Sequence, residues 1–528
     1  AAAPYPPTAA IGAAASNPLT AEPSRFTAAM DKVILNRFLG LPIFLFVMYL
    51  MFLLAINIGG ALQPIFDAGS VAIFVHGIQW LGYTLHFPDW LTVFLAQGIG
   101  GGINTVLPLV PQIGMMYLFL SFLEDSGYMA RAAFVMDRLM QALGLPGKSF
   151  VPLIVGFGCN VPSVMGARTL DAPRERLMTI MMAPFMSCGA RLAIFAVFAA
   201  AFFGQNGALA VFSLYVLGIV MAILTGLMLK HTIMRGEASP FVMELPVYHV
   251  PHIKSLIIQT WQRLKGFVLR AGKVIVIVSI FLSALNSFSL SGKVVDNIND
   301  SALASVSRVI TPVFKPIGVH EDNWQATVGL FTGAMAKEVV VGTLNTLYTA
   351  EDIQNEEFNP QTFSLGEELL AAVDETWQGL KDTFSLSVLA NPIEASKGDG
   401  EMATGAMGVM GSKFGSAAAA YSYLIFVLLY IPCISVMGAI ARESSRGWMT
   451  FSILWGLNIA YSLSTLYYQT VSFSDHPRYS LVCILAVVLF NVVLFGLLRR
   501  ARSRVDVSLL ATRKTPASCC SSPAGDCH

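Results

Sequence analysis

Three cysteines share one local pattern, in which the thiol lies close to a proline inside an apolar stretch. Cys159 lies three residues before a proline, Cys188 four residues after one, and Cys433 directly after one. Proline removes a helical N–H bond and frees a carbonyl about one turn earlier, so each thiol is expected beside backbone oxygens that need a partner. Together with the neighbouring Asn160 and Ser187, such ligands suit a borderline divalent transition metal better than Mg²⁺ or Ca²⁺.

Packing is the alternative explanation for the same cysteines. Free cysteine behaves as a small buried hydrophobe, and proline is common in membrane helices. Cys483 provides an internal comparison, because the residues around it, Leu-Val-Cys-Ile-Leu at 481–485, contain no helix breaker. We expect Cys483 only to pack, and for the other three the residues alone leave packing and metal binding open.

Charged residues at the ends of apolar runs, or inside them, are weaker metal candidates. Glu124 and Asp125 end one run, and Glu338 follows Lys337 inside another. Charge at membrane depth is costly and by default indicates a functional site. The alternatives are placement at the cytoplasmic edge for the first pair, and a Lys337–Glu338 ion pair that holds its segment in shape.

The C-terminal tail contains a second group of metal-binding residue types. Three thiols and an imidazole lie within ten residues and could hold a soft metal weakly. The alternative is that a reducing cytosol simply tolerates these cysteines. The group consists of Cys519, Cys520, Cys527 and His528.

Composition indicates the kind of molecule that positions these residues. The chain has 528 residues, of which 55% are hydrophobic and 12% charged, against about 25% charged in soluble proteins. A soluble surface cannot be built from so few charges, and disorder is excluded for the same reason. The net charge of +1 gives no basic field to hold nucleic acid. The sequence therefore predicts an all-α polytopic membrane protein.

Apolar runs of about 20 residues predict about eight crossing helices. Two further segments, 150–166 and 325–347, contain glycines or prolines and are predicted to be re-entrant or broken. Such backbone is stable at membrane depth only when protein buries it or when it lines a wet cavity. The predicted crossings are 40–58, 105–123, 178–203, 209–229, 267–288, 417–440, 449–468 and 480–498.

Basic residues follow the positive-inside rule if both termini are cytoplasmic. A Phe-Leu-Ser-Phe-Leu run at 119–123 and a Phe-Leu-Ser-Ala-Leu run at 281–285 each precede an amphipathic stretch, a glycine and a broken segment. This predicts an inverted repeat with the site between the copies, against the alternative of chance similarity.

The predicted organisation is a flexible linker (1–30), a first membrane half with the first Gate region (31–230), a cytoplasmic loop (231–265), a second Gate region (266–350), an acidic external loop (351–416), C-terminal membrane helices (417–500) and a cytoplasmic Cys-rich tail (501–528).

Several of these motifs resemble one known family. Residues 156–162 are Gly-Phe-Gly-Cys-Asn-Val-Pro, residues 182–192 are Met-Ala-Pro-Phe-Met-Ser-Cys-Gly-Ala-Arg-Leu, and residues 428–433 are Leu-Leu-Tyr-Ile-Pro-Cys. They resemble FeoB, the bacterial ferrous iron transporter family, and most closely its enterobacterial members. Residues 124–131 and 336–340 are similar to its two Gate regions.

The resemblance implies Fe²⁺ import across the bacterial cytoplasmic (inner) membrane, with Cys159, Cys188 and Cys433 as the leading metal ligands. It also implies membrane lipid and a small FeoA-like cytosolic protein as partners. The family carries an N-terminal GTP-binding domain that the chain is expected to lack, so GTP and Mg²⁺ would act only through that domain. The chain itself is then expected not to be an enzyme.

Other functions remain as alternatives at this stage. Gate regions also occur in nucleoside-type carriers of small organic solutes, which need polar and aromatic groups around an organic ligand. A membrane enzyme needs a catalytic or cofactor motif, and Gly147-Lys148-Ser149 lacks the leading glycine of a phosphate loop. A scaffold for a GTPase needs no broken helices. The sequence leaves open whether the chain forms a homo-oligomer.

The predicted topology can be tested in the acidic loop. A reporter fused at Asp382 should report the outer side of the membrane, because five predicted crossings precede it and the N-terminus is cytoplasmic. Alkaline phosphatase activity with no green fluorescence is the expected result. A cytoplasmic signal at Asp382 would mean that segment 325–347 crosses or that another crossing is miscounted.

Overall fold

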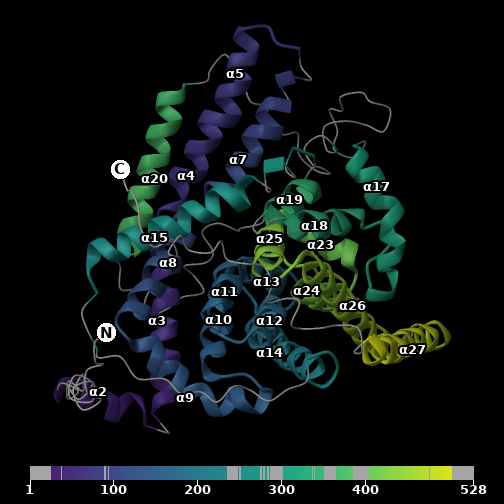
Figure 1. Cartoon of the computed structure of the whole chain (residues 1–528). Helices are drawn as coiled ribbons and strands as arrows, with labels where there is room; N and C mark the ends of the chain where they lie inside the picture. Colours follow the sequence, from purple (N-terminus) through teal and green to yellow (C-terminus); the bar gives the residue numbers. More distant parts are fainter. Residues whose placement is uncertain are drawn as a thin grey trace, which may run out of the picture.

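The computed structural model describes most of the chain between residues 25 and 501. The regular elements in this part are all helical (Figure 1), which confirms the predicted all-α class. The described residues are 25–36, 39–88, 91–92, 94–234, 248, 251–273, 276–277, 280–281, 285, 301–335, 337, 339–349, 364–383, 404–474 and 476–501.

The first part of the chain builds a group of long helices that lie along one another (Figure 1). α3 packs against α8, and the later helix α20 packs against both α3 and α4. Their bounds are α2 (Arg25–Ile34), α3 (Gly40–Ala61), α4 (Gln63–Ser70), the π-helical turn η1 (Val71–His76), α5 (Gly77–Thr84), the π-helical η2 (Phe94–Gly100), α7 (Gly101–Val106), α8 (Leu109–Asp125), α9 (Tyr128–Leu143) and α20 (Leu365–Thr383).

Several of the following helices, from α10 to α13, are short because glycine and proline interrupt them. The predicted broken segment 150–166 forms α10 and α11, with a non-helical stretch between them. The predicted crossing 178–203 is also interrupted, between η5 and α13. The bounds are η3 (Gly147–Ser149), α10 (Phe150–Val155), α11 (Asn160–Gly166), η4 (Ala167–Thr169), α12 (Pro173–Met182), η5 (Ala183–Phe185), α13 (Gly189–Phe202), η6 (Gly204–Asn206) and α14 (Gly207–His231).

The later part of the chain repeats this interrupted pattern. Segment 325–347 forms α18 and α19, and the run 417–440 forms α24 and α25 on either side of Pro432. The bounds are α15 (Ile253–Phe267), the π-helical η7 (Val268–Gly272), α17 (Ala302–Ile310), η9 (Thr311–Ile317), α18 (Trp324–Met335), α19 (Val339–Thr349), α23 (Thr404–Phe414), α24 (Ala417–Leu429), α25 (Ile434–Glu443), α26 (Arg446–Val471) and α27 (Pro477–Ala501).

Helix α24 lies at the centre of the largest hydrophobic core. Every residue from Ser422 to Leu429 is buried, and the helix packs against α13, α14 and α26. Phe198 of α13 and Phe414 of α23 stack around Tyr423. A helix that is apolar on all sides is typical of the interior of a membrane bundle, so α24 anchors the elements that surround it.

Five helical stretches of the described residues are long and apolar enough to cross a membrane. α26 contains the predicted crossing 449–468 and α8 covers most of 105–123, whereas the described residues cover 267–288 only in part. The number of crossings therefore stays a prediction. The five stretches are Gly40–Thr84, Pro173–Phe202, Gly207–His231, Ala417–Glu443 and Pro477–Arg500.

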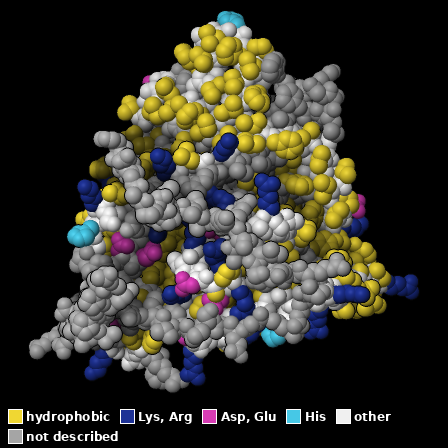
Figure 2. Space-filling model, viewed as in Figure 1, with side chains coloured by type: hydrophobic (Ala, Val, Ile, Leu, Met, Phe, Trp, Pro, Cys, Tyr) yellow, Lys and Arg dark blue, Asp and Glu magenta, His cyan; other side chains and the backbone are white. Residues whose placement is uncertain are grey.

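The surface carries the apolar character expected of a protein in lipid. In Figure 2, hydrophobic side chains cover the end of the molecule formed by α4 and α5, and Lys and Arg side chains gather across the middle and at the opposite end of this face. α27 exposes large apolar side chains along its length, among them Leu485, Leu489 and Val493. Two asparagines, Asn458 and Asn491, bond across the contact between α26 and α27 at 3.0 Å and fix its register.

A buried arginine joins the N-terminal helix α2 to α9. The Arg131 side chain is fully buried, and its guanidinium pairs with the Asp31 carboxylate. Its Nη1 also donates to Gly127 O at 2.9 Å, and the guanidinium lies 3.7 Å from the centroid of the Tyr248 ring. Three separate segments therefore share one charged contact.

A second ion pair joins the ends of α11 and α25. Arg168, directly after α11, forms a two-pronged pair with Glu443 at the end of α25, and the Nε–Oε2 distance is 2.6 Å. The hydrogen bond to Glu443 raises the pKa of Arg168 above its ordinary value. Arg176 Nη2 donates to the Glu443 backbone oxygen at 3.2 Å.

Replacing the carboxylate of this pair should destabilise the fold. Glu443→Gln should lower the free energy of unfolding by about 1–3 kcal/mol, because hydrogen bonds to a buried charged partner are lost. Thermal unfolding in detergent measures the change. Glu321→Gln removes an exposed pair with Lys315 and should leave the melting temperature unchanged. Equal melting temperatures for Glu443→Gln and the unmodified protein would contradict this role.

Candidate functional site

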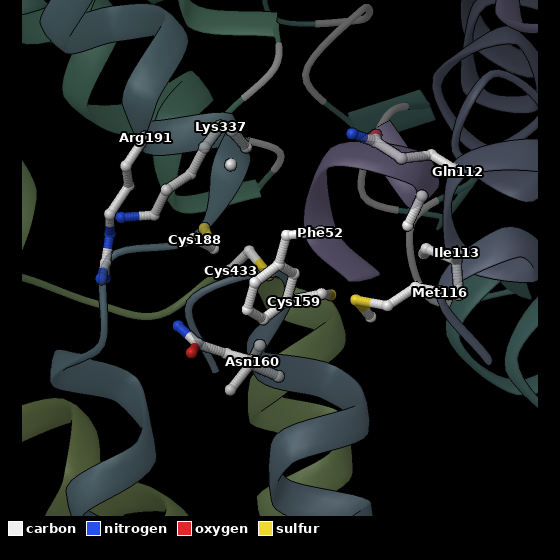
Figure 3. A pocket seen from close by; sticks show the side chains of 15 residues that line it. Phe52, Gln112, Ile113, Met116, Cys159, Asn160, Cys188, Arg191, Lys337 and Cys433 are labelled. Carbon is white, nitrogen blue, oxygen red and sulfur yellow. The ribbon is translucent and has the colours of Figure 1, made fainter. Parts of the chain in front are cut away.

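Interruptions in four helical segments surround one small cavity. The cavity has a volume of about 70 Å³. Its lining comes from α3, α8, α11, α13, α25 and the stretches that precede α11, α13, α19 and α25 (Figure 3). The irregular backbone therefore lies inside the protein around a cavity, where such backbone is tolerated at membrane depth.

The three proline-associated cysteines occupy equivalent positions around this cavity. Cys159, Cys188 and Cys433 are the residues directly before α11, α13 and α25, and each has a non-helical, extended ψ angle. The carbonyl of each accepts the first hydrogen bonds of the helix that follows. All three line the cavity. The shared local pattern therefore goes with a shared place in the fold, and the role of the three cysteines as metal ligands stays a prediction.

The sulfur atoms line the cavity without converging on one point. Among the described residues, no three His, Cys, Asp or Glu side chains lie close enough together to hold one metal ion. Met116 of α8 adds a thioether to the lining. In Figure 3 its sulfur points toward Cys159 across the cavity. The cavity therefore offers soft ligands in a loose arrangement.

Two buried cations also line the cavity. Arg191 of α13 is fully buried, and Lys337 is 3% exposed. Arg191 Nη1 donates to Pro184 O at 3.0 Å and to Met186 O at 2.9 Å. Lys337 Nζ donates to Val427 O at 3.2 Å. The Lys337 ammonium also lies 4.4 Å from the centroid of the Tyr430 ring, a favourable cation–π distance.

These contacts correct the expectation that the backbone oxygens at the breaks need a partner. Pro162 leaves the Gly158 carbonyl without a helical donor, but that oxygen accepts the Gly189 N–H at 3.2 Å. The oxygens of Pro184, Met186 and Val427 are bonded by side chains, as described above. The expectation was wrong for these oxygens because the protein satisfies them internally.

The two predicted oxygen ligands beside the cysteines differ in position. Asn160 lines the cavity, and its Nδ2 donates to Met186 O at 3.3 Å. Its amide is turned away from the Cys159 sulfur in Figure 3. Ser187 is buried between η5 and α13 but is not among the residues that line the cavity.

The weaker metal candidates lie elsewhere or outside the described residues. Arg263 of α15 bonds Glu124 at 2.9 Å, and Gln259 bonds Asp125 at 3.4 Å, so both carboxylates contact α15 and neither lines the cavity. Cys483 lies on α27, also away from the cavity. Outside the described residues lie Glu338 and the tail residues Cys519, Cys520, Cys527 and His528.

The sequence analysis did not identify Arg191, Met116 or Phe52 as parts of the site. Arg191 had a usable signal, since it is a charged residue inside the predicted crossing 178–203. Met116 and Phe52 had none, because their residue types are common in apolar helices. Both pack closely on Gly158, where an added Cβ would lie 2.5 Å from Phe52 Cε1 and 2.8 Å from Met116 Sδ.

Comparison with known proteins identifies relatives of the whole chain. A Gate family model described as "Nucleoside recognition" matches residues 106–202 and 268–446, and a model described as "Ferrous iron transport protein B C terminus" matches residues 211–263. The chain is 90% identical over 524 residues to the "Fe(2+) transporter FeoB" of Salmonella typhi, covering 99% of the chain and 68% of that protein. It is 88% identical over 525 residues to the protein of the same name in Escherichia coli K12, with the same coverage. No solved structure matches significantly.

The close packing on Gly158 can be tested directly. Gly158→Ala should displace Phe52 and Met116 and destabilise the protein by about 1–3 kcal/mol, the usual cost of overpacking. Gly166→Ala is the matched control, since an added Cβ there meets its nearest atom, in Pro152, at an ordinary 3.7 Å. Thermal unfolding of the two variants measures the difference. Equal melting temperatures would show that the lining side chains adjust freely.

Proposed function

Because the chain belongs to the FeoB family of Fe²⁺ transporters, we propose that it carries Fe²⁺ into the cell across the bacterial cytoplasmic membrane. The ion would pass through the cavity lined by Cys159, Cys188 and Cys433. The observation that carries this proposal is the meeting of three thiols from separate helix breaks on one cavity. Thiolate ligands suit Fe²⁺ and other borderline transition metals better than Mg²⁺ or Ca²⁺.

The size of the cavity favours an ion over an organic solute. Sites for small organic molecules usually have volumes of about 300–1,000 Å³, whereas this cavity has about 70 Å³. Its lining also contains no Asp, Glu or His among the described residues. These features weaken the alternative of a nucleoside-type carrier, which the description "Nucleoside recognition" of one matching family model would suggest.

The loose arrangement of the sulfur atoms fits transport better than storage. A transported ion must leave its site as readily as it enters, so tight four-coordinate binding would slow its release. Thiols on separate short helices can approach an ion and withdraw as the helices move. The geometry therefore supports a transient ferrous site.

We also propose the topology that the sequence predicted. It has about eight crossings, both termini in the cytoplasm, and two re-entrant segments related by an inverted repeat. Support comes from the helical breaks in both predicted segments, between α10 and α11 and between α18 and α19. A further argument is that transporters of this plan hold their substrate between broken helices.

Nucleotide control would come from a GTP-binding region of the family that lies outside this chain, with Mg²⁺ bound there. The chain spans 68% of the length of its curated relatives. The turn at Arg168–Arg176 and helix α15 would receive that region, together with a FeoA-like protein. In support, Arg174 bonds the backbone of Met234 at 2.9 Å and Arg176 that of Glu443, so this turn links segments that the proposed topology puts in the cytoplasm.

Metal binding by the cysteines can be measured on the purified chain. Mutating a residue that only hydrogen-bonds a metal ligand typically lowers metal affinity about 10–100-fold. Replacing a ligand itself, Cys159, Cys188 or Cys433, by serine should therefore weaken anaerobic Fe²⁺ binding at least about tenfold. Serine offers a harder, protonated oxygen. Equilibrium dialysis and ⁵⁵Fe²⁺ uptake into proteoliposomes provide two readouts.

Cys483→Ser is the matched control, and its binding and uptake should equal those of the unmodified chain. Loss of binding in Cys483→Ser alone would contradict the assignment. So would unchanged binding in all three cavity variants.

A further inference from the structure

Part of a buried guanidinium beside the cavity has no partner. Arg191 is fully buried and lines the cavity. Its Nη1 donates to the oxygens of Pro184 and Met186. Its Nε and Nη2 share one edge of the planar guanidinium, and neither has a hydrogen-bond partner in the part of the chain that the structure describes. A buried charge is normally paired with an opposite charge, so this edge calls for one.

Two other arginines of the chain show what this edge of a guanidinium binds. Arg131 holds the Asp31 carboxylate through Nε and Nη2. Arg168 holds the Glu443 carboxylate through the same two nitrogens. The edge presents two parallel N–H groups, which suit an anion that accepts both bonds at once. Since the Arg191 edge has no such partner among the described residues, its geometry suits an anion from outside the chain.

The surroundings of Arg191 are positive as well. Lys337 lines the same cavity, and in Figure 3 its ammonium lies on the same side of it as the Arg191 guanidinium. Helices α13 and α25 both begin at the cavity, and helix N-termini carry partial positive charge. Among the described residues, no Asp or Glu lines the cavity. An entering Fe²⁺ ion therefore meets a positive field, which an anion would balance.

We propose that Arg191 binds a small monovalent anion beside the cavity, and that the charge of this anion favours Fe²⁺ binding. The inference rests on the proposed function, because it names a charge partner for the same ion. The first turn of α13, whose Gly189 and Ala190 line the cavity, adds the N–H groups of a helix start, which favour anions. A water molecule takes about 30 Å³, so a cavity of about 70 Å³ has room for an ion and one small anion.

The chain itself has two other sources of negative charge. Thiolates of the cavity cysteines are one source, but no sulfur is a hydrogen-bond partner of Arg191 Nε or Nη2. The Glu338 carboxylate is the other, and it lies outside the described residues. Either source would make Fe²⁺ binding independent of added anions, whereas the proposed anion site makes it depend on them.

This difference can be measured by changing only the anion of the buffer. Two ligands that favour each other raise each other's affinity by the same factor, typically about 5–150-fold. Anaerobic Fe²⁺ binding should therefore be at least about fivefold tighter in chloride or in formate than in methanesulfonate, a larger and weakly coordinating anion, at equal ionic strength. Equilibrium dialysis of the full chain measures the affinities. Equal affinities in all three salts would overturn the proposal.

A variant and its matched control assign the effect to Arg191. Arg191→Gln removes the charge but keeps N–H donors for the Pro184 and Met186 oxygens, and it should abolish the anion dependence. Lys230 also donates to a backbone oxygen, that of Ala142 at 3.2 Å, and does not line the cavity. Lys230→Gln should therefore keep the full dependence. Dependence that persists in a folded Arg191→Gln protein, or an equal loss in Lys230→Gln, would contradict the assignment.

Anion binding can also be measured without iron, which separates this inference from the proposed function. A ligand that binds only the folded state raises the melting temperature. Chloride or formate should therefore raise the melting temperature of the iron-free chain above its value in methanesulfonate, and Arg191→Gln should remove the rise. A rise without Fe²⁺ binding in any salt would contradict the proposed function alone. Fe²⁺ binding without a rise and without anion dependence would overturn the anion site alone, and both measurements on the unmodified chain stand even if Arg191→Gln does not fold.

Discussion

The structure depends on one constraint, which is that broken backbone inside a membrane protein must find hydrogen-bond partners within the protein. Unsatisfied N–H or C=O groups at membrane depth cost several kcal/mol each. The breaks before α11 and α13 satisfy each other through the Gly189 N–H and the Gly158 oxygen. Arg191 and Lys337 satisfy further oxygens beside the same cavity. These bonds hold the breaks in place beside the cavity.

The short helices that begin at the cavity connect it to the cytoplasmic side of the proposed topology. α11 begins after Cys159 and α25 after Cys433, the two helices pack against each other, and their far ends are joined by Arg168 and Glu443. The ion pair and the two cysteines therefore lie at opposite ends of the same two packed helices.

The helix breaks beside the cysteines could be predicted from the sequence, because proline and glycine mark such breaks locally. The partners of the oxygens at these breaks could not, because they depend on how the side chains fold back or on segments far along the chain. Lys337 and Val427 are 90 residues apart, and Glu124 and its partner Arg263 are 139 residues apart. Arg191 was visible as a charge inside an apolar run, but only the folded chain shows that it holds two carbonyls. Helix positions followed from composition, and the interruption of 178–203 lies between Pro184 and Gly189, where the sequence carries the same local signal.

The central claim is that the sulfur of the cavity cysteines binds the ion. X-ray absorption at the iron edge of the purified chain, loaded anaerobically with one equivalent of Fe²⁺, tests it most directly. The account predicts sulfur scatterers in the first coordination shell, and a smaller sulfur contribution when Cys188 is replaced by serine. A first shell made only of oxygen and nitrogen would contradict it.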